Sequence, residues 1–286
     1  MFSKVAFAAL AALAASPVFA DPASPLAIAT VKQEFVNALL TPSVVPTFDP
    51  AALLNVTFAS VGSITTGQAI PMAQVGVKPT ITVVGTDADF ASGGPFNSST
   101  KYTIMMIDGD VPGAANAKGV NTHYLQNDLS YGTLTADVLT FTNTTPAVIN
   151  YAGPGPASGS GPHRYTLLIY AQPSTFKAPA TPTAGSSVTM IDFPTYLTSA
   201  GLTTALAGTY FTVEVGTATV SFSSTTAVNT ATLSVASAAG TGAATGTATG
   251  SAASSTGTKA ASGAIVKGVD GFAAMFVALG MGLIFA

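Results

Sequence analysis

The feature that most constrains this 286-residue chain is a tract near its C-terminus that has too few bulky side chains to form a core. Residues 236–258 consist only of Ala, Ser, Thr and Gly. Such a composition cannot bury enough apolar surface to offset the conformational entropy of ordering the backbone. We therefore expect residues 222–262 to form a disordered, Ser/Thr-rich stalk, and we look for a folded domain in residues 21–221.

The N-terminus has the pattern of a secretory signal peptide. In residues 1–20 a single basic residue, Lys4, precedes an apolar run over residues 5–15, and Val18 and Ala20 stand third and first before the expected cleavage point. This order is typical of a cleavable signal. The apolar run is shorter than the about 20 residues that a membrane-spanning helix needs. We therefore expect the mature chain to be secreted.

The C-terminus has the order of a glycosylphosphatidylinositol (GPI) attachment signal. Small residues at 260–263 are followed by a short spacer and by the uncharged residues 271–286. These are the three parts of such a signal. A membrane-spanning helix is the alternative, but Gly280, Gly282 and the short length disfavour it. We expect residues 263–286 to be removed and the chain to be held at the cell surface or cell wall by a lipid, its only link to a membrane.

Charge and cysteine content exclude several classes of function. The net charge of −3 gives no cationic field for a polyanion, which excludes nucleic-acid binding as the main role. The chain has no Cys, which excludes disulfide bonds and thiolate metal sites. In a secreted chain, three Asn-x-Ser/Thr triplets are candidate N-glycosylation sites: Asn55, Asn97 and Asn143.

Hydrophobic periodicity between residues 21 and 221 predicts one helix followed mostly by strands. Residues 27–40 have helical spacing and end at Thr41-Pro42. Strands are expected at residues 53–58, 80–84, 102–107, 165–170 and 211–215. The third and fourth of these are continuous apolar runs, typical of central strands buried on both faces. Clusters of Gly, Pro and Ser separate the segments, so the fold class is mainly β with peripheral helices.

Polar residues concentrate at the ends of the two expected central strands. Asp108 and Asp110 follow the first strand, His163 and Arg164 precede the second, and His123 is the only other histidine. In an extended backbone two Asp at i and i+2 point the same way. Their mutual repulsion then needs a nearby cation, such as an imidazolium. The alternative is a capped turn whose carboxylates accept backbone N–H groups.

The same residues admit two further interpretations. Two Asp and two His could ligate a metal ion, but the chain has no short ligand spacing such as His-x-x-x-His, so we expect no metal and no cofactor. Ser158 and Ser160 stand near His163 in the sequence, yet a Gly/Ser loop is usually a linker, and no nucleophile–base pattern is recognisable. We therefore expect a binding protein and not an enzyme.

Four blocks in the same order resemble the phosphatidylethanolamine-binding protein family. Residues 102–112 look like the family's Asp-Pro-Asp-x-Pro block with its preceding strand, and residues 123–125 look like its His-aromatic-Leu strand. Residues 151–156 are similar to its Gly-Pro-x-Pro loop, and residues 161–165 match its Gly-x-His-Arg block. The resemblance covers about residues 26–216.

The resemblance implies a fold and a site. The fold would be an antiparallel β-sandwich, with a large central sheet packed on a smaller one and helices at the edge. A pocket for anionic groups would lie at one end of the sheet, lined by Asp108, Asp110, His123, Gly153, Pro154, His163 and Tyr165. Arg164 would instead pair with a carboxylate inside the fold, because adjacent strand residues point to opposite faces.

Two departures from the family pattern concern this pocket. Gly109 stands where the family has Pro, which would loosen the turn that carries the two carboxylates. Asn121-Thr122 stands where the family often has an aromatic residue, which would make one wall of the pocket less apolar.

Three hypotheses of function follow. The first is a non-enzymatic protein with a small anion pocket for a phospholipid head group or another phospho-ligand, which binds more tightly as the histidines protonate below about pH 6.5. The second is an inhibitor of a secreted or vacuolar serine carboxypeptidase, which is the activity of one branch of the family. The third is a cell-wall glycoprotein with a vestigial pocket.

Overall fold

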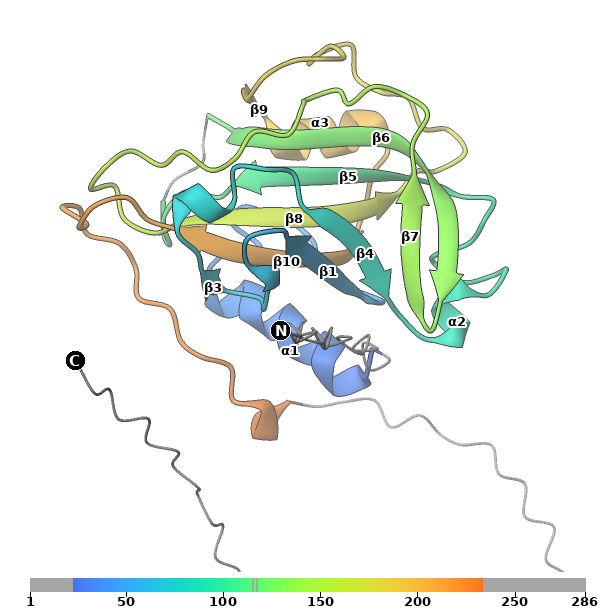
Figure 1. The fold of residues 1–286 in the computed structure, drawn as a ribbon, viewed down its shortest axis with the longest axis horizontal. Helices are drawn as coiled ribbons and strands as arrows, with labels where there is room; N and C mark the ends of the chain where they lie inside the picture. The colour runs from blue at the N-terminus through green and yellow to red at the C-terminus, as the bar shows by residue number, and fades with distance from the viewer. Residues whose placement is uncertain (1–22, 115, 117, 234–286) are drawn as a thin grey trace, which may run out of the picture. The chain divides into compact units, whose positions relative to one another are not determined.

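The computed structural model describes residues 23–233, except 115 and 117 (Figure 1). The expected signal peptide (1–20), residues 234–262 of the expected stalk and the expected GPI signal (263–286) lie outside the described residues. They stay predictions.

Far more of the described residues lie in strands than in helices, which confirms the predicted mainly β class. The strands are β1 (Leu53–Phe58), β2 (Gly62–Ser63), β3 (Gln68–Ala69), β4 (Thr80–Val84), β5 (Lys101–Asp108), β6 (Val120–Thr135), β7 (Val138–Thr142), β8 (His163–Ala171), β9 (Thr189–Ile191) and β10 (Ala205–Val213). The helices are α1 (Pro25–Asn37), α2 (Asp87–Phe90) and α3 (Phe193–Ala200), with 3-10 turns η1 (Met72–Gln74) and η2 (Thr230–Thr232).

The strands form one curled sheet in the order β2-β1-β4-β7-β6-β5-β8-β10-β3, with β9 paired to β6. The neighbours are antiparallel apart from β10 and β3. Figure 1 shows β6, β5, β8 and β10 side by side across the view, whereas β1, β4 and β7 cross in front of them. The long strand β6 belongs to both parts, because its first half pairs with β5 and its second half with β7. The expected large and small sheets are therefore two parts of one continuous sheet.

The central strands are buried on both faces. One core lies between the two parts of the sheet and includes Met106 and Leu167. The other core includes Met105 and Leu168 together with residues of α1 and α3. Neighbouring residues of β5 and β8 thus enter different cores, which explains why both strands read as continuous apolar runs.

Helix α1 ends beside the strand that carries the expected site. Ser24 caps its N-terminus, and the helix stops at Asn37, short of the predicted end, because Leu39 adopts a left-handed φ of 56°. The carbonyl oxygen of Ala38 then accepts a hydrogen bond from Arg164 at 2.6 Å. This bond links the end of α1 to the start of β8.

Residues 214–226, which we call the C-terminal strap, follow β10 and lie against the loops at the same end of the sheet. The Thr219 N–H donates to the carbonyl of Gly159 at 2.8 Å, and the Ser223 N–H donates to the carbonyl of Pro112 at 2.9 Å. Further along, the carbonyl of Thr226 accepts a hydrogen bond from Asn37 at 3.0 Å. A stalk is expected from residue 222, yet these contacts tie residues 222–226 to the domain.

Candidate functional site

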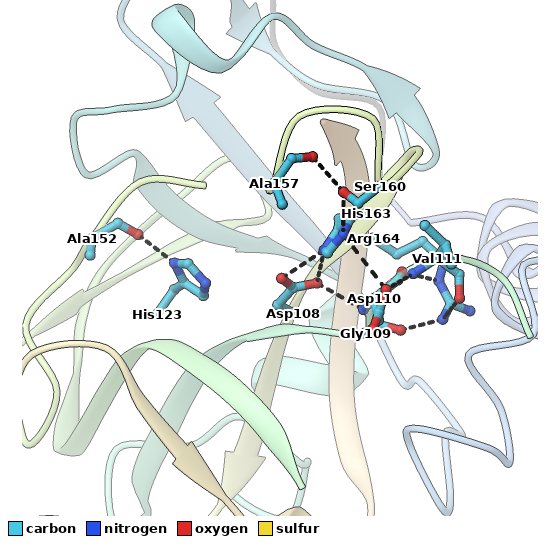
Figure 2. Close-up of polar contacts among 10 residues, drawn as sticks. All are labelled: Asp108, Gly109, Asp110, Val111, His123, Ala152, Ala157, Ser160, His163 and Arg164. Carbon is cyan, nitrogen blue, oxygen red and sulfur yellow. Dashed lines mark hydrogen bonds and ion pairs between the residues drawn. The ribbon is translucent and has the colours of Figure 1, made fainter. Parts of the chain in front are cut away.

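Three strands bring the predicted site residues to one end of the sheet. Asp108 is the last residue of β5, His163 is the first residue of β8, and His123 lies near the start of β6. Because β5 is antiparallel to both neighbours, its end meets their beginnings, with Asp108 opposite Tyr165 on β8 and Asn121 on β6. Figure 2 shows Asp108 between the two imidazoles.

Asp108 and His163 form a largely buried pair. Nδ1 of His163 lies 2.9 Å from Oδ2 and 3.1 Å from Oδ1 of Asp108, and the two side chains are 13% and 8% exposed. Burial acts to lower the pKa of His163, but the hydrogen bond and charge of Asp108, with the charge of Asp110, outweigh it and raise that pKa. His163 therefore keeps its proton to a higher pH than a free imidazole does.

The turn after β5 carries a second carboxylate toward the same imidazole. Asp110 adopts a left-handed φ of 57°, and its N–H donates to Oδ1 of Asp108 at 2.8 Å. Its own Oδ1 lies 3.6 Å from Nε2 of His163, and its side chain is 48% exposed. Both carboxylates thus approach one ring, while Asp108 also caps the turn.

Arg164 binds backbone carbonyls, not the carboxylate that we expected. It is 1% exposed, and it donates to the carbonyl oxygens of Asp110 (2.9 Å), Val111 (3.0 Å) and Gly109, in addition to Ala38. Within the part of the chain that the structure describes, no Asp or Glu lies at ion-pair distance from it. The physical reason is the tight turn of residues 109–111, which directs its carbonyls onto the guanidinium.

The hydrogen bonds from Arg164 to the carbonyls of residues 109–111, which we call the guanidinium clamp, restrain the turn that Gly109 was expected to loosen. Burial lowers the pKa of Arg164 to about 10, which still leaves the group charged at neutral pH. Arg164 therefore places a fixed positive charge beneath the two carboxylates.

His123 is oriented by the loop that covers it. Its Nδ1 lies 3.1 Å from the carbonyl oxygen of Ala152, and the Ala152 N–H donates back to the carbonyl of His123 at 2.9 Å. A carbonyl only accepts, so Nδ1 carries the proton and Nε2 is the nitrogen left to meet a ligand. The ring packs edge-on against Tyr165, with centroids 5.2 Å apart.

Gly153 and Pro154 follow Ala152 in the loop that orients His123, and Tyr165 packs against both imidazoles. A Cβ on Gly153 would lie 2.8 Å from the Cα of Gly76, so only glycine lets the 151–156 loop pack this closely, and Pro154 is buried in the same loop. Tyr165 is fully buried, and among the described residues its hydroxyl has no hydrogen-bond partner. Burial and the neighbouring charge of Asp108 raise the pKa of Tyr165, so the hydroxyl remains a neutral donor.

The structure adds Ser160, which the sequence pattern had suggested was part of a linker. Its Oγ lies 3.0 Å from Nε2 of His163 and 2.7 Å from the carbonyl oxygen of Ala157 (Figure 2). The only signal in the sequence was its spacing of three residues from His163. The fold of the loop is needed to bring the hydroxyl to the ring.

The three predicted glycosylation sites differ in accessibility. Asn143 is exposed. Asn55 is half-buried on β1, accepts a hydrogen bond from Ser63 and lines a cavity of about 530 Å³ between α1 and β1. Asn97 is half-buried, and its amide bonds to Gly94. Asn143 is therefore the site best placed to carry a glycan on the folded surface.

Two general properties of the described residues bear on function. None of the helices in this part of the chain has the length and apolar character of a membrane span. In the same residues, no three side chains among His, Cys, Asp and Glu come close enough together to hold a metal ion.

The model of the family "Phosphatidylethanolamine-binding protein" matches residues 60–217, more than half of the chain. Among curated proteins, the chain is 30% identical over 151 residues to a "26 kDa secreted antigen" of Toxocara canis, covering 51% of this chain and 48% of that protein. It is 28% identical over 192 residues to the "CEN-like protein 1" of Nicotiana tabacum, and the match covers 66% of this chain and 95% of that protein.

A third relative is the "Carboxypeptidase Y inhibitor" of Saccharomyces cerevisiae, with 28% identity over 142 residues that cover 44% of this chain and 65% of that protein. The solved structure of a carboxypeptidase Y inhibitor complexed with its cognate proteinase is similar at a TM-score of 0.49 and 21% identity, covering 67% of this chain and 95% of that one. The match thus spans about half the length of the Toxocara protein and nearly all of the tobacco protein.

Proposed function

This chain belongs to the phosphatidylethanolamine-binding protein family, and from that premise we propose that it binds, without chemical turnover, a phosphate-bearing ligand such as a phospholipid head group. The site is the end of the sheet where Asp108, His123 and His163 meet. The observation that carries the proposal is the pair of imidazoles: Asp108 acts to raise the pKa of His163, and His123 is turned so that its Nε2 is left for a ligand. When protonated, His123 can donate from Nε2 to a phosphate oxygen, whereas His163, whose two ring nitrogens face Asp108 and Ser160, contributes a positive charge.

The balance of charge decides when an anion binds. Two carboxylates face the site, and a phosphate beside them needs compensation. Arg164 supplies one positive charge at all physiological pH values, and His163 supplies a second below its raised pKa. Affinity is therefore expected to rise as the pH falls through the pKa of His163 and to weaken as the pH rises through it.

The exposed carboxylate of Asp110 favours zwitterionic head groups. Its side chain is 48% exposed and lies 3.6 Å from His163, so it can accept from the ammonium of phosphoethanolamine while the phosphate meets the imidazoles. Phosphoethanolamine is therefore expected to bind more tightly than inorganic phosphate.

Calorimetric titration tests the proposal. Phosphoethanolamine and inorganic phosphate are titrated into the full-length chain at about pH 5.5 and about pH 8, on either side of the ordinary histidine pKa. We expect His163→Gln to weaken binding at the lower pH by roughly 10- to 100-fold, the worth of one charged hydrogen bond. Asp87→Asn, an exposed charge change on α2, is the control and leaves affinity unchanged. Absence of binding at both pH values supports a vestigial site and overturns the proposal.

We also propose that the chain is secreted and held at the cell surface by a GPI anchor. The signal-like termini support this location, and so does the similarity to a protein named as a secreted antigen. Expression in a eukaryotic host, followed by phosphatidylinositol-specific phospholipase C, is expected to release the chain from cells. Retention on the cells after that treatment contradicts the anchor.

A second candidate function is inhibition of a serine carboxypeptidase. It is favoured by the 28% identity to the yeast carboxypeptidase Y inhibitor. The test is to add the full-length chain at micromolar concentration to purified carboxypeptidase Y. Loss of peptidase activity supports this candidate, and full activity refutes it.

A further inference from the structure

Ser160, His163 and Asp108 form one hydrogen-bonded line. Ser160 Oγ lies 3.0 Å from Nε2 of His163, and Nδ1 of the same ring lies 2.9 Å from Oδ2 of Asp108. This is the arrangement in which a base activates a hydroxyl while a carboxylate orients the base. We propose that Ser160 is an activated nucleophile that takes the acyl group of small esters, a reactivity that goes beyond the binding function proposed above and does not depend on it.

The turn that carries Ser160 is held by the C-terminal strap. Gly159 and Gly161 adopt left-handed φ values of 81° and 94°. The N–H of Gly159 donates to the carbonyl of Val215, and its carbonyl accepts from Thr219, both at 2.8 Å. A Cβ on Gly161 would lie 3.2 Å from the ring of Phe222. The C-terminal strap therefore holds the serine in place, which is the pre-organisation that a nucleophile needs.

The single hydroxyl proton of Ser160 has two acceptors, and the charge of His163 chooses between them. When the ring is protonated, Nε2–H donates to Ser160 Oγ and the hydroxyl donates to Ala157 at 2.7 Å, so the serine is inert. When the ring is neutral, Asp108 keeps the remaining proton on Nδ1, and Nε2 can accept the hydroxyl proton.

Several groups set this protonation. The charged and titratable groups that face His163 are Asp108 and Asp110 at the end of β5, and Arg164 and Tyr165 on β8. The carboxylates hold the proton on the ring, and Arg164 acts against them. Reactivity of Ser160 is therefore expected to rise with pH, opposite to the affinity for phosphate.

The step balances without a cofactor. Ser160 Oγ attacks the carbonyl carbon of the ester, and its proton passes to Nε2 of His163. The C–O bond to the alcohol then breaks, and the alcohol leaves with that proton. The acyl group remains as an ester on Ser160, and the imidazole is neutral again. Asp108 is a positioning residue, since it acts on the ring and not on the ester.

The test is covalent labelling of the full-length chain with p-nitrophenyl acetate, followed by intact mass, release of nitrophenolate and peptide mapping. We expect one acetyl group on Ser160, with a rate that rises between about pH 6 and about pH 9, on either side of the ordinary histidine pKa. Ser160→Ala and His163→Gln are expected to lower the rate by on the order of 100-fold or more, the usual worth of a general base. Ser158→Ala, an exposed serine of the same loop, is the matched control and labels at the wild-type rate.

A fluorophosphonate probe applied to the wild-type chain must modify the same serine, so the outcome does not depend on how a variant folds. Absence of any adduct on Ser160 across this pH range, or equal labelling of Ser160→Ala, overturns the proposal. Phosphate binding is measured separately by calorimetry, so the two proposals fail independently.

Discussion

Replacing Arg164 by Met tests whether the guanidinium clamp holds the site together. Arg164 is 1% exposed, and two of its four carbonyl partners, Ala38 and Gly109, are buried. Methionine has a similar length but no donor, so it leaves those two oxygens without a partner. An unsatisfied buried acceptor costs about 1–3 kcal/mol, which gives an expected loss of about 2–6 kcal/mol. The free energy of unfolding of the whole domain is expected to be only about 5–15 kcal/mol.

The assay is urea unfolding of the full-length chain, followed by circular dichroism because the chain contains no Trp. Arg164→Lys keeps the charge but not the planar fork of donors, so its free energy of unfolding is expected to lie between those of the wild type and Arg164→Met. Lys177→Met, which removes an exposed charge, is the control and stays within about 0.5 kcal/mol of wild type. A loss below about 1 kcal/mol for Arg164→Met refutes the clamp, because it is less than the cost of one unsatisfied buried acceptor.

Three further predictions concern stability and modification. The pKa of His163 is raised in the folded state, so its pairing with Asp108 stabilises the fold fully below the unfolded pKa and loses this effect as the pH rises through the folded pKa. In urea unfolding, the loss of free energy of unfolding caused by His163→Gln is therefore expected to shrink from acid to alkaline pH. A loss that is the same at all pH values contradicts this. Gly153→Ala is expected to lower the free energy of unfolding by about 1–3 kcal/mol in the same assay, because the added Cβ meets backbone atoms. Gly93→Ala is the control, because a Cβ there has open space around it. Equal stabilities of the two variants count against the packing argument. In a eukaryotic secretory host Asn143→Gln is expected to remove a glycan that gel mobility detects, and unchanged mobility argues against glycosylation there.

The central strands follow from local patterns, and the place of the site follows once those strands are neighbours. Two continuous apolar runs mark strands buried on both faces, and Met105 and Met106 in different cores show why no alternation appears. Because antiparallel neighbours bring an end beside a beginning, Asp108 after one run and His163 before the other had to meet. That these two strands are neighbours was implied by the family resemblance and not by a local pattern.

The rest depends on partners that are distant in the sequence. The length of β6 was not predicted, because buried Gln126 and Asn127 interrupt the apolar pattern and form hydrogen bonds with Thr145 and Thr103 from other parts of the chain. The partners of Arg164 come from a turn and a helix end, so the sequence pointed to a carboxylate instead. Residues 222–226 of the C-terminal strap were assigned to the stalk by composition, and only their hydrogen bonds show that they lie against the domain.

The central claim, that both imidazoles face one phosphate-binding site, is tested most directly by proton NMR of the ring signals. The chain has only two histidines, so two Cε1–H signals are assigned with His123→Gln and His163→Gln. Titration with phosphoethanolamine is expected to shift both signals with one common dissociation constant and to raise the pKa at which His163 titrates. Signals that do not move, or that move with different dissociation constants, contradict a shared site.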